Sequence, residues 1–162
     1  MKATVLLISI AIIFIFNSCS YEYNCDNTSI TPVFIKFQLQ DIDTLVIRKY
    51  ATNTNFTTIL DSSIAQSVGF GNYTIHNDSI IVELRSERLQ IEPGFDWQIF
   101  IPAKNKVVNI SAINSPSTTA KCNTGLFSKL GCACFNPIIS CKQNNQYFAF
   151  NNVNFYAIFI NN

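Results

Sequence analysis

Short stretches in which apolar residues occupy every second position recur along the chain. The clearest lies at residues 95–101, and its apolar face consists of Phe95, Trp97, Ile99 and Ile101. A period of two is typical of a β-strand with one buried face, whereas a helix repeats its apolar positions every three to four residues. The pattern predicts strands, and no stretch of the chain has a convincing helical period.

Turn signals separate these stretches at short intervals. Residues 73–76 and 79–85 flank Asn77-Asp78, which is typical of a hairpin. Residues 33–40 also alternate, and their predicted buried face consists of Val33, Ile35, Phe37 and Leu39. About eight or nine such segments predict an all-β fold, a single antiparallel β-sandwich of immunoglobulin-like or related type. A β-barrel would give a similar pattern and stays open as the alternative.

The first 18 residues differ from the rest of the chain. Lys2 gives a positive start, residues 5–16 are apolar except for Ser9, and small or polar residues follow. A charged start, an apolar core of about 7–15 residues and a small-residue cleavage region define a secretory signal peptide. The apolar run is shorter than the roughly 20 residues that a transmembrane helix needs. We therefore expect residues 1–18 to be removed.

This segment ends in Phe16-Asn17-Ser18-Cys19. It resembles the lipobox of bacterial lipoproteins of the Bacteroidetes type, although Phe16 and Asn17 stand where a leucine and a smaller residue are usual. The resemblance implies that Cys19 becomes the N-terminus and carries acyl chains such as palmitate, which anchor a protein stably to a bilayer. Ser20, which is not an aspartate, implies the outer membrane. An ordinary signal peptide with a chance cysteine is the alternative.

Without the signal peptide the chain is long enough for one domain with a substantial core. Residues 19–32 are largely polar and predict a lipidated N-terminus and tether, and residues 33–162 predict the sandwich, with a Cys-rich loop at 121–142. The chain has 11 Lys and Arg against 10 Asp and Glu, and Lys2 leaves with the signal peptide. A neutral domain without a basic run argues against a nucleic-acid partner.

Four of the six cysteines lie in the loop at 121–142: Cys122, Cys132, Cys134 and Cys141. An exported chain enters an oxidising compartment, where such cysteines form disulfides. We expect two bridges within the loop, with a pairing that the sequence leaves open, so that Cys25 is the odd thiol, free or paired between chains. Zinc is the alternative, but one residue between Cys132 and Cys134 is tighter than the usual Cys-x₂₋₄-Cys spacing.

Residues suited to catalysis are sparse. His76 is the only histidine, and no Gly-x-Ser-x-Gly motif accompanies it. We therefore expect a structural histidine and no catalytic residue. Asp41 and Asp43 would face one way in an extended segment, but Ca²⁺ takes six to eight oxygen ligands, so a solvated turn is favoured over a metal site. We expect no metal and no cofactor.

Two tripeptides, Asp-Thr-Leu at 43–45 and Asp-Ser-Ile at 78–80, resemble the Asp-(Ser/Thr)-apolar sequence that Bacteroidetes O-glycosylate on exported proteins. The resemblance implies Thr44 and Ser79 as candidate glycosylation sites. Thr44 lies at a predicted strand start and Ser79 at the edge of a predicted turn, and both positions favour exposure.

These observations predict a non-enzymatic module for binding or assembly at the cell envelope. Its expected partners are the membrane, through the lipid on Cys19, and an envelope protein or glycan. Aromatic candidates for contact with a sugar ring or a protein are Tyr21, Tyr23, Phe70, Tyr73 and Tyr147. The alternative is a small carbohydrate-active or other hydrolase whose catalytic residues converge only in the folded chain.

Overall fold

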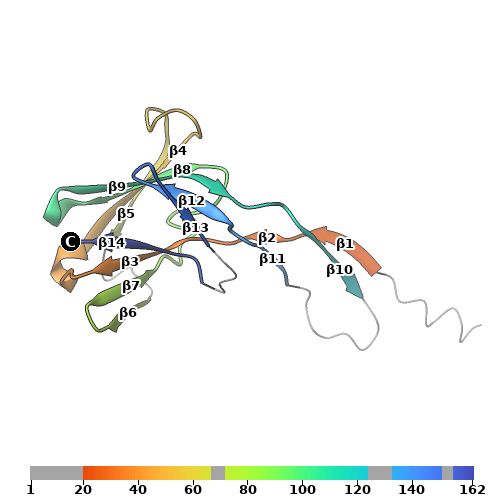
Figure 1. Ribbon diagram of the computed structural model, residues 1–162, viewed down its shortest axis with the longest axis horizontal. Coiled ribbons are helices and arrows are strands. Elements are labelled where there is room, and N and C mark those ends of the chain that lie inside the picture. Colours follow the sequence, from red (N-terminus) through yellow and green to blue (C-terminus); the bar gives the residue numbers. More distant parts are fainter. Residues whose placement is uncertain (1–19, 67–71, 124–132, 151–154) are drawn as a thin grey trace, which may run out of the picture. The chain divides into compact units, whose positions relative to one another are not determined.

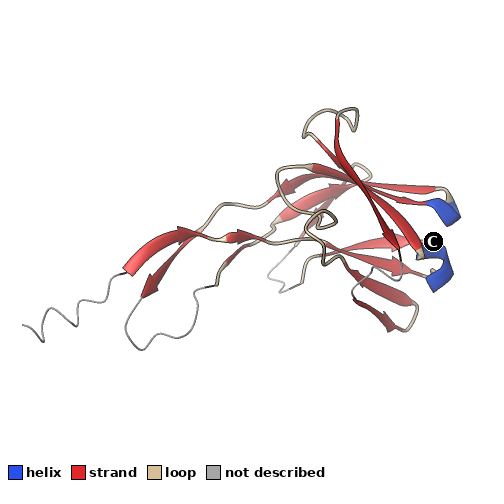
Figure 2. Cartoon of the chain, turned by 180° about the vertical axis from the view of Figure 1, so that it is seen from behind, coloured by secondary structure: helices blue, strands red, loops and turns tan. Residues whose placement is uncertain are grey.

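The computed structural model describes residues 20–66, 72–123, 133–150 and 155–162 (Figure 1). The chain divides into two compact units: the sandwich unit (residues 27–116 and 137–162) and the ribbon unit (residues 1–26 and 117–136). Within the described ranges nearly every element is a strand, and the helical elements are two short 3₁₀ turns, η1 (Leu39–Ile42) and η2 (Pro102–Lys104) (Figure 2). None of the helices in these ranges is long and apolar enough to cross a membrane.

The larger sheet of the sandwich unit has six strands, and all its neighbouring strands pair antiparallel. In spatial order they are β13 (Gln146–Ala149), β12 (Ser140–Gln143), β9 (Lys106–Asn114), β8 (Asp96–Ile101), β4 (Thr44–Tyr50) and β5 (Ile59–Gln66). The period of two predicted for residues 95–101 is confirmed in β8, where Trp97, Ile99 and Ile101 are buried. The indole N–H of Trp97 donates to the carbonyl of Glu92 at 2.9 Å, so the polar atom of this buried ring is also satisfied.

The smaller sheet has four strands: β14 (Ala157–Asn161), β3 (Thr31–Ile35), β7 (Ser79–Glu83) and β6 (Asn72–His76). The predicted hairpin around Asn77-Asp78 is the β6–β7 pair. β7 also pairs antiparallel with β3, but β14 pairs parallel with β3, which the sequence did not indicate. The last strand therefore lies at an edge of the sheet, beside a strand that lies more than a hundred residues earlier in the chain.

Apolar side chains from both sheets fill the space between them. Fully buried members include Phe34 and Ile158 from the smaller sheet and Leu45, Trp97 and Ile110 from the larger one. Burial of a side chain of this size contributes about 1.5–3 kcal/mol. The predicted all-β fold with a sandwich of antiparallel sheets is confirmed, with the parallel β14–β3 pair as its one departure.

The predicted buried face of residues 33–40 is only partly confirmed, because Val33 and Phe37 are buried but Leu39 is exposed and Phe34, between the predicted positions, is buried as well. β3 ends at Ile35, and Lys36 has a positive φ of 61°, which ends the strand before the predicted face is complete. Phe34 faces the core with no exposed surface, whereas Val33 lies on the opposite side of the sheet and Leu39 is exposed in η1. Residues 32–35 are apolar without interruption, so within β3 no period of two identifies the face that points into the core.

The ribbon unit contains two short antiparallel pairings. β1 (Ser20–Asn24) pairs with β10 (Thr119–Asn123), and β2 (Asp26–Asn27) pairs with β11 (Phe135–Asn136). The segment predicted as a lipidated N-terminus and tether, residues 19–32, therefore contains β1, β2 and the start of β3. The predicted loop at 121–142 likewise contains β11 and parts of β10 and β12.

Candidate functional site

An apolar row crosses the outer face of the four-stranded sheet. The strand register places Phe159 beside Val33, and Val33 beside Ile81. Cross-strand partners lie on one face of a sheet with their Cβ atoms about 4.5–5.5 Å apart, so these three side chains form a continuous strip. Their neighbours along the strands, Phe34 and Ile158, point into the core.

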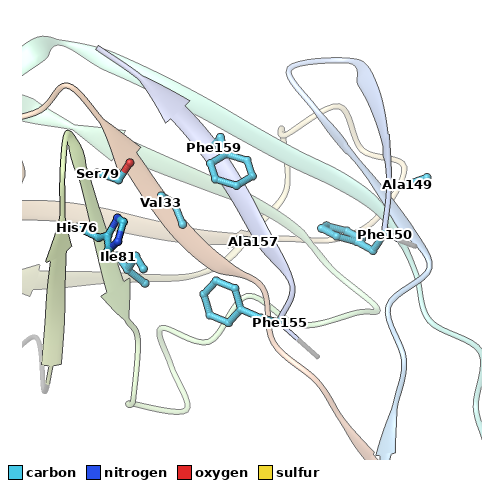
Figure 3. Close-up of a pocket in the computed structure, with 9 residues that line it drawn as sticks. All are labelled: Val33, His76, Ser79, Ile81, Ala149, Phe150, Phe155, Ala157 and Phe159. Carbon is cyan, nitrogen blue, oxygen red and sulfur yellow. The ribbon is translucent and has the colours of Figure 1, made fainter. Parts of the chain in front are cut away.

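This strip forms the floor of a groove with a volume of ≈ 400 Å³ (Figure 3). Its lining consists of Val33, His76, Ser79, Ile81, Ala149, Phe150, Phe155, Ala157 and Phe159. Phe155 and Phe159 are 49% and 54% exposed, which is high for phenylalanine. Figure 3 shows their rings at the groove, with Ala149 and Phe150 on the far side of β14 from Val33. Val33, in the floor of the groove, is only 4% exposed, so Phe155 and Phe159 contribute most of the exposed apolar surface. Exposed apolar side chains grouped in a groove favour an interaction site.

His76 and Ser79 are the polar members of the lining, and they are direct cross-strand partners in the β6–β7 hairpin. A nucleophilic serine needs a base within hydrogen-bond reach and a third group that orients the base. No side-chain hydrogen bond joins His76 to Ser79, both of which lie in the part of the chain that the structure describes. The sequence does not indicate that this pair lies in an apolar groove, because most of the apolar lining comes from strands that are distant along the chain.

Thr44 and Ser79, the candidate glycosylation sites, are each the first residue of a strand, β4 and β7, and each is partly exposed. The structure separates them. Ser79 lies in the groove, whereas Thr44 lies in the other sheet, where it pairs with Gln66. A sugar on Ser79 would therefore occupy the groove, and a sugar on Thr44 would not.

The Asp41 carboxylate has a local structural role. It accepts the backbone N–H of Gln38 at 3.0 Å, which caps η1, and forms an ion pair with Lys104 at 3.1 Å. The hydrogen bond from Gln38, with Lys104 as a further cause, lowers the pKa of Asp41 below its usual value. Asp43 follows η1 as its exposed C-cap residue. Among the described residues, no group of three His, Cys, Asp or Glu side chains could hold a metal ion.

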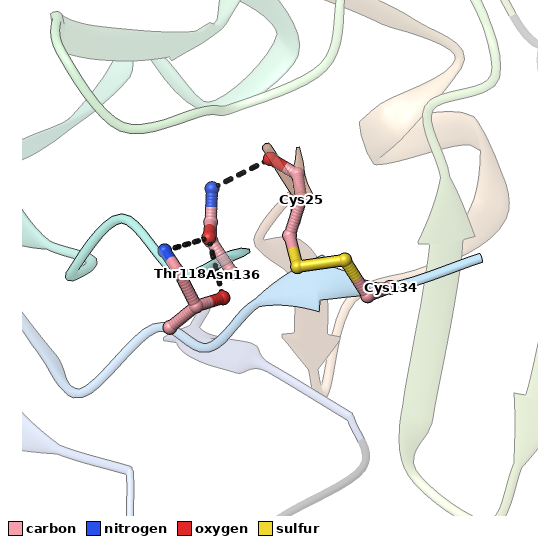
Figure 4. Close-up of a disulfide and its surroundings, with 4 residues drawn as sticks. All are labelled: Cys25, Thr118, Cys134 and Asn136. Carbon is pink, nitrogen blue, oxygen red and sulfur yellow. Dashed lines mark hydrogen bonds between the residues drawn. A yellow bond between two sulfur atoms is a disulfide. The ribbon is translucent and has the colours of Figure 1, made fainter. Parts of the chain in front are cut away.

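The disulfide of the ribbon unit joins Cys25 to Cys134, with their Cα atoms 4.9 Å apart (Figure 4). Beside it, the buried Asn136 amide donates to the Cys25 carbonyl at 2.9 Å and accepts both the N–H and the hydroxyl of Thr118 at 2.8 and 2.9 Å. The bridge joins residues that are 109 positions apart. In the chain-entropy model, closing a loop of this length stabilises the folded chain by about 4–5 kcal/mol. The disulfide and the hydrogen bonds of Asn136 together connect the chain at residues 25, 118, 134 and 136.

The predicted cysteine pairing is corrected in two respects. Cys25 is not the odd thiol, and Cys134 pairs outside the loop at 121–142. The reason is strand pairing: β2 and β11 bring together residues 25 and 134, which are 109 positions apart, and spacing along the chain does not reveal this contact. Cys132 and the side chain of Cys122 lie outside the described residues, as does Cys19.

Cys141 is also corrected, since it is a free thiol rather than half of a bridge. It lies in β12 with no exposed surface and belongs to the core cluster. Burial disfavours the thiolate and raises the pKa of Cys141 to about 11. Such a thiol behaves as a small apolar side chain and is a poor nucleophile.

Sequence reasoning missed the aromatic residues of the groove. Of its aromatic candidates, Tyr73 and Tyr147 are exposed, but neither lines the groove, and Phe70 and the side chain of Tyr21 lie outside the described residues. The signal that could have found Phe159 is the run Ala-Ile-Phe-Ile at 157–160, which is apolar on both faces. A strand of this kind has both faces covered, either by the protein itself or by a partner.

The chain matches no protein-family model, no curated protein and no solved structure.

Proposed function

We propose that this chain is a lipid-anchored, non-enzymatic binding module of the bacterial cell envelope, which binds its partner in the apolar groove of the four-stranded sheet. The observation that carries the proposal is the half-exposed pair of rings, Phe155 and Phe159, over the strip formed by Val33 and Ile81. Removal of apolar surface from water contributes about 25 cal/mol per Å². A partner with a matching apolar surface therefore gains affinity in this groove.

The chemistry of the lining supports binding over hydrolysis. Its one imidazole, His76, and its one hydroxyl, Ser79, are set among seven apolar side chains. A hydrolase would need a base oriented by a third group and donors aimed at a developing oxyanion. An ester or glycoside substrate whose turnover is abolished by His76→Ala would contradict the non-enzymatic proposal.

The anchor proposed for this module is the acylated Cys19, as the lipobox-like segment implies, and its proposed location is the outer membrane. β1 begins at Ser20, so a lipid on Cys19 would be attached one residue before this strand. We expect Cys19→Ala to release the protein to the soluble fraction or to leave an uncleaved precursor. A Cys19→Ala protein that is cleaved normally and stays in the membrane would contradict the anchor.

The groove is tested with two matched variants of the full chain. Phe159→Ser removes an exposed apolar side chain from the groove, and Ile64→Ser removes one that is 65% exposed on the outer face of the other sheet. Binding of each variant to detergent-solubilised envelope proteins and to envelope glycans is measured by surface plasmon resonance. We expect Phe159→Ser alone to weaken binding, by about tenfold or more. Equal binding by both variants and the unaltered chain would refute the groove as the site.

A further inference from the structure

β6 is an unprotected edge strand of the four-stranded sheet. Among the described strands it pairs with β7 alone, and its residues 73–76 are all exposed. These residues, Tyr-Thr-Ile-His, include no lysine, arginine, carboxylate or proline, and the β6–β7 register has no bulge. Proteins commonly use such charges, prolines and bulges to keep an edge strand from pairing with another chain. At the other edge of the sheet, by contrast, the carbonyls of Phe159 and Asn161 already accept hydrogen bonds from the six-stranded sheet.

The core side of the sheet continues uncovered onto β6. Cross-strand partners form one row on this side, which consists of Ile160, Phe34, Ile80 and Ile75. The first three side chains are buried, whereas Ile75 on β6 is 54% exposed. Tyr73 lies on the same face, opposite the buried Val82, and is 43% exposed. Two rows of the core therefore end in apolar side chains that nothing in the described part of the chain covers.

The N–H and C=O groups of Tyr73 and Ile75 point along the free edge of β6. The N–H of Lys36 donates to the carbonyl of Asp78 at 2.7 Å, so the even-numbered residues that follow along β7 direct their backbone groups toward β3. The odd-numbered residues of β7 bond instead to their partners in β6, which are even-numbered. Tyr73 and Ile75 alternate with these partners, so their backbone groups are not used by β7.

We propose that a second copy of this chain binds along this edge, with the two β6 strands antiparallel and Thr74 opposite Thr74 of the second copy. The two-fold axis then places Tyr73 of each copy opposite Ile75 of the other. Each of these two pairs exchanges two backbone hydrogen bonds, which use the free N–H and C=O groups. An axis at Ile75 would instead place Tyr73 opposite Asn77 in the hairpin turn, so the axis at Thr74 is the one that pairs both free residues within the strand.

The side chains of β6 complement a second copy of the same strand. On the core side, the row that ends at Ile75 continues into Tyr73 and the buried Val82 of the second copy. Pairs of an aromatic with a β-branched side chain stabilise neighbouring strands, as do hydrogen-bonded threonine pairs such as the one at Thr74. Residues 73–76 carry no lysine, arginine or carboxylate, so no such like charges meet. Symmetry supplies this match twice, which favours a second copy over an unrelated strand.

This interface is small, so the association is weak. A single pair of short strands belongs at the low end of interface sizes, below about 1,200 Å². Attachment of both copies to one membrane, as proposed above, raises their effective concentration and strengthens the dimer. Because the axis is perpendicular to the sheet, both apolar grooves lie on the same face of the joined sheet. A weak dimer of this kind is best detected by covalent trapping.

A cysteine at the two-fold axis traps the dimer. Thr74→Cys places two thiols opposite each other in a non-hydrogen-bonded pair, where Cα atoms lie about 4.5 Å apart, within the range of a disulfide. His76→Cys is the matched control, because it is exposed on the same face of the same strand but its two copies lie more than about 10 Å apart along the strands. Intact cells that express each full-length variant are oxidised with copper phenanthroline, and the unaltered chain gives the background from its own cysteines. We expect at least about tenfold more disulfide-linked dimer from Thr74→Cys, and peptide mapping should locate the bond at position 74 of both copies.

A charge at the free edge should prevent trapping. Ile75→Lys is added to Thr74→Cys, and Ile64→Lys, at a 65% exposed position of the other sheet, is the control. Both positions are exposed, so neither lysine should unfold the chain. We expect about tenfold less dimer with Ile75→Lys and no change with Ile64→Lys. Equal trapping by Thr74→Cys and His76→Cys, no trapping by either, or equal effects of the two lysines would overturn the proposal.

Discussion

The two outer faces of the sandwich unit are built from similar strands and differ in chemistry. On the four-stranded sheet, the row formed by Phe159, Val33 and Ile81 is apolar and lines a groove. On the six-stranded sheet, the register aligns Arg48 with Gln98 and Asn109 in a polar row. Arg48 donates to Gln98 Oε1 at 2.7 Å, and Gln98 Nε2 donates to Asn109 Oδ1 at 2.9 Å, so these groups satisfy one another.

The difference shows which face has more to gain from a partner. Polar groups that are already bonded gain little when a partner replaces water, because the net value of a hydrogen bond is about 0.5–1.5 kcal/mol. Exposed apolar rings gain with every Å² that a partner covers. The polar face also has an apolar row of Ile64, Val46, Phe100 and Val107, in which Ile64 is 65% and Val107 43% exposed. In this row the Arg48 guanidinium lies 5.6 Å from the centroid of the Phe100 ring. Because the rings of Phe155 and Phe159 line a groove, we propose the four-stranded sheet as the binding face.

The largest expected effect separates the inner side of the smaller sheet from its outer side. Phe34→Ala should lower the free energy of unfolding by about 3–5 kcal/mol, because Phe34 is fully buried. Phe159→Ala should cost less than about 1 kcal/mol, since that ring is half exposed. Urea denaturation measures both values. Similar losses for the two variants would show that the outer ring is part of the folded core rather than of a free face.

Alkaline pH should act on the core and not on either outer face. The pKa of Cys141 is raised to about 11 from 9.0, so the folded chain holds the thiol proton over a range in which the unfolded chain loses it. Stability is then complete below pH 9 and falls between pH 9 and 11, by an amount of the order of 2 kcal/mol. Unfolding free energies at pH 8 and 10.5 measure the loss. Cys141→Ala should be less stable at both pH values but should lose less unfolding free energy between them. An equal loss in the variant and the unaltered chain would show that Cys141 does not cause the pH dependence.

The smallest effect is expected on the polar face. Gln98→Leu removes the hydrogen bonds of Gln98 with Arg48, with Asn109 and with the hydroxyl of the buried Tyr50, so it should cost about 1–2 kcal/mol of stability. Binding in the groove should not change. A loss of partner binding by Gln98→Leu that matches the loss by Phe159→Ser would transfer the functional site to the six-stranded sheet.

The sequence predicted what depends on local pattern. The alternation at 95–101 located β8, and Asn77-Asp78 located the β6–β7 hairpin, because both signals lie within a few residues. The all-β class followed from many such signals together. In β3 both Val33 and Phe34 are buried, because residues 32–35 are apolar throughout, and only the neighbouring strands decide that Phe34 points into the core.

Features that depend on long-range pairing could not be predicted. Cys25 lies close to Cys134 only because β2 pairs with β11, so proximity along the chain suggested the wrong partner. The groove has the same origin, since β14 joins β3 in parallel and brings Phe159 beside Val33. The free edge of β6 depends on the order of strands in the sheet, and nothing in residues 72–76 indicates that this strand lies at an edge.

Site-specific photo-crosslinking in intact cells tests most directly whether the groove is the binding face. The photoreactive residue p-benzoyl-L-phenylalanine replaces Phe155 in one strain and Ile64 in another, so that the two outer faces carry matched exposed probes. Irradiation should give a discrete adduct from position 155, which Phe159→Ser abolishes, and no such adduct from position 64. The same adducts from both positions, or adducts from position 64 alone, would contradict the account.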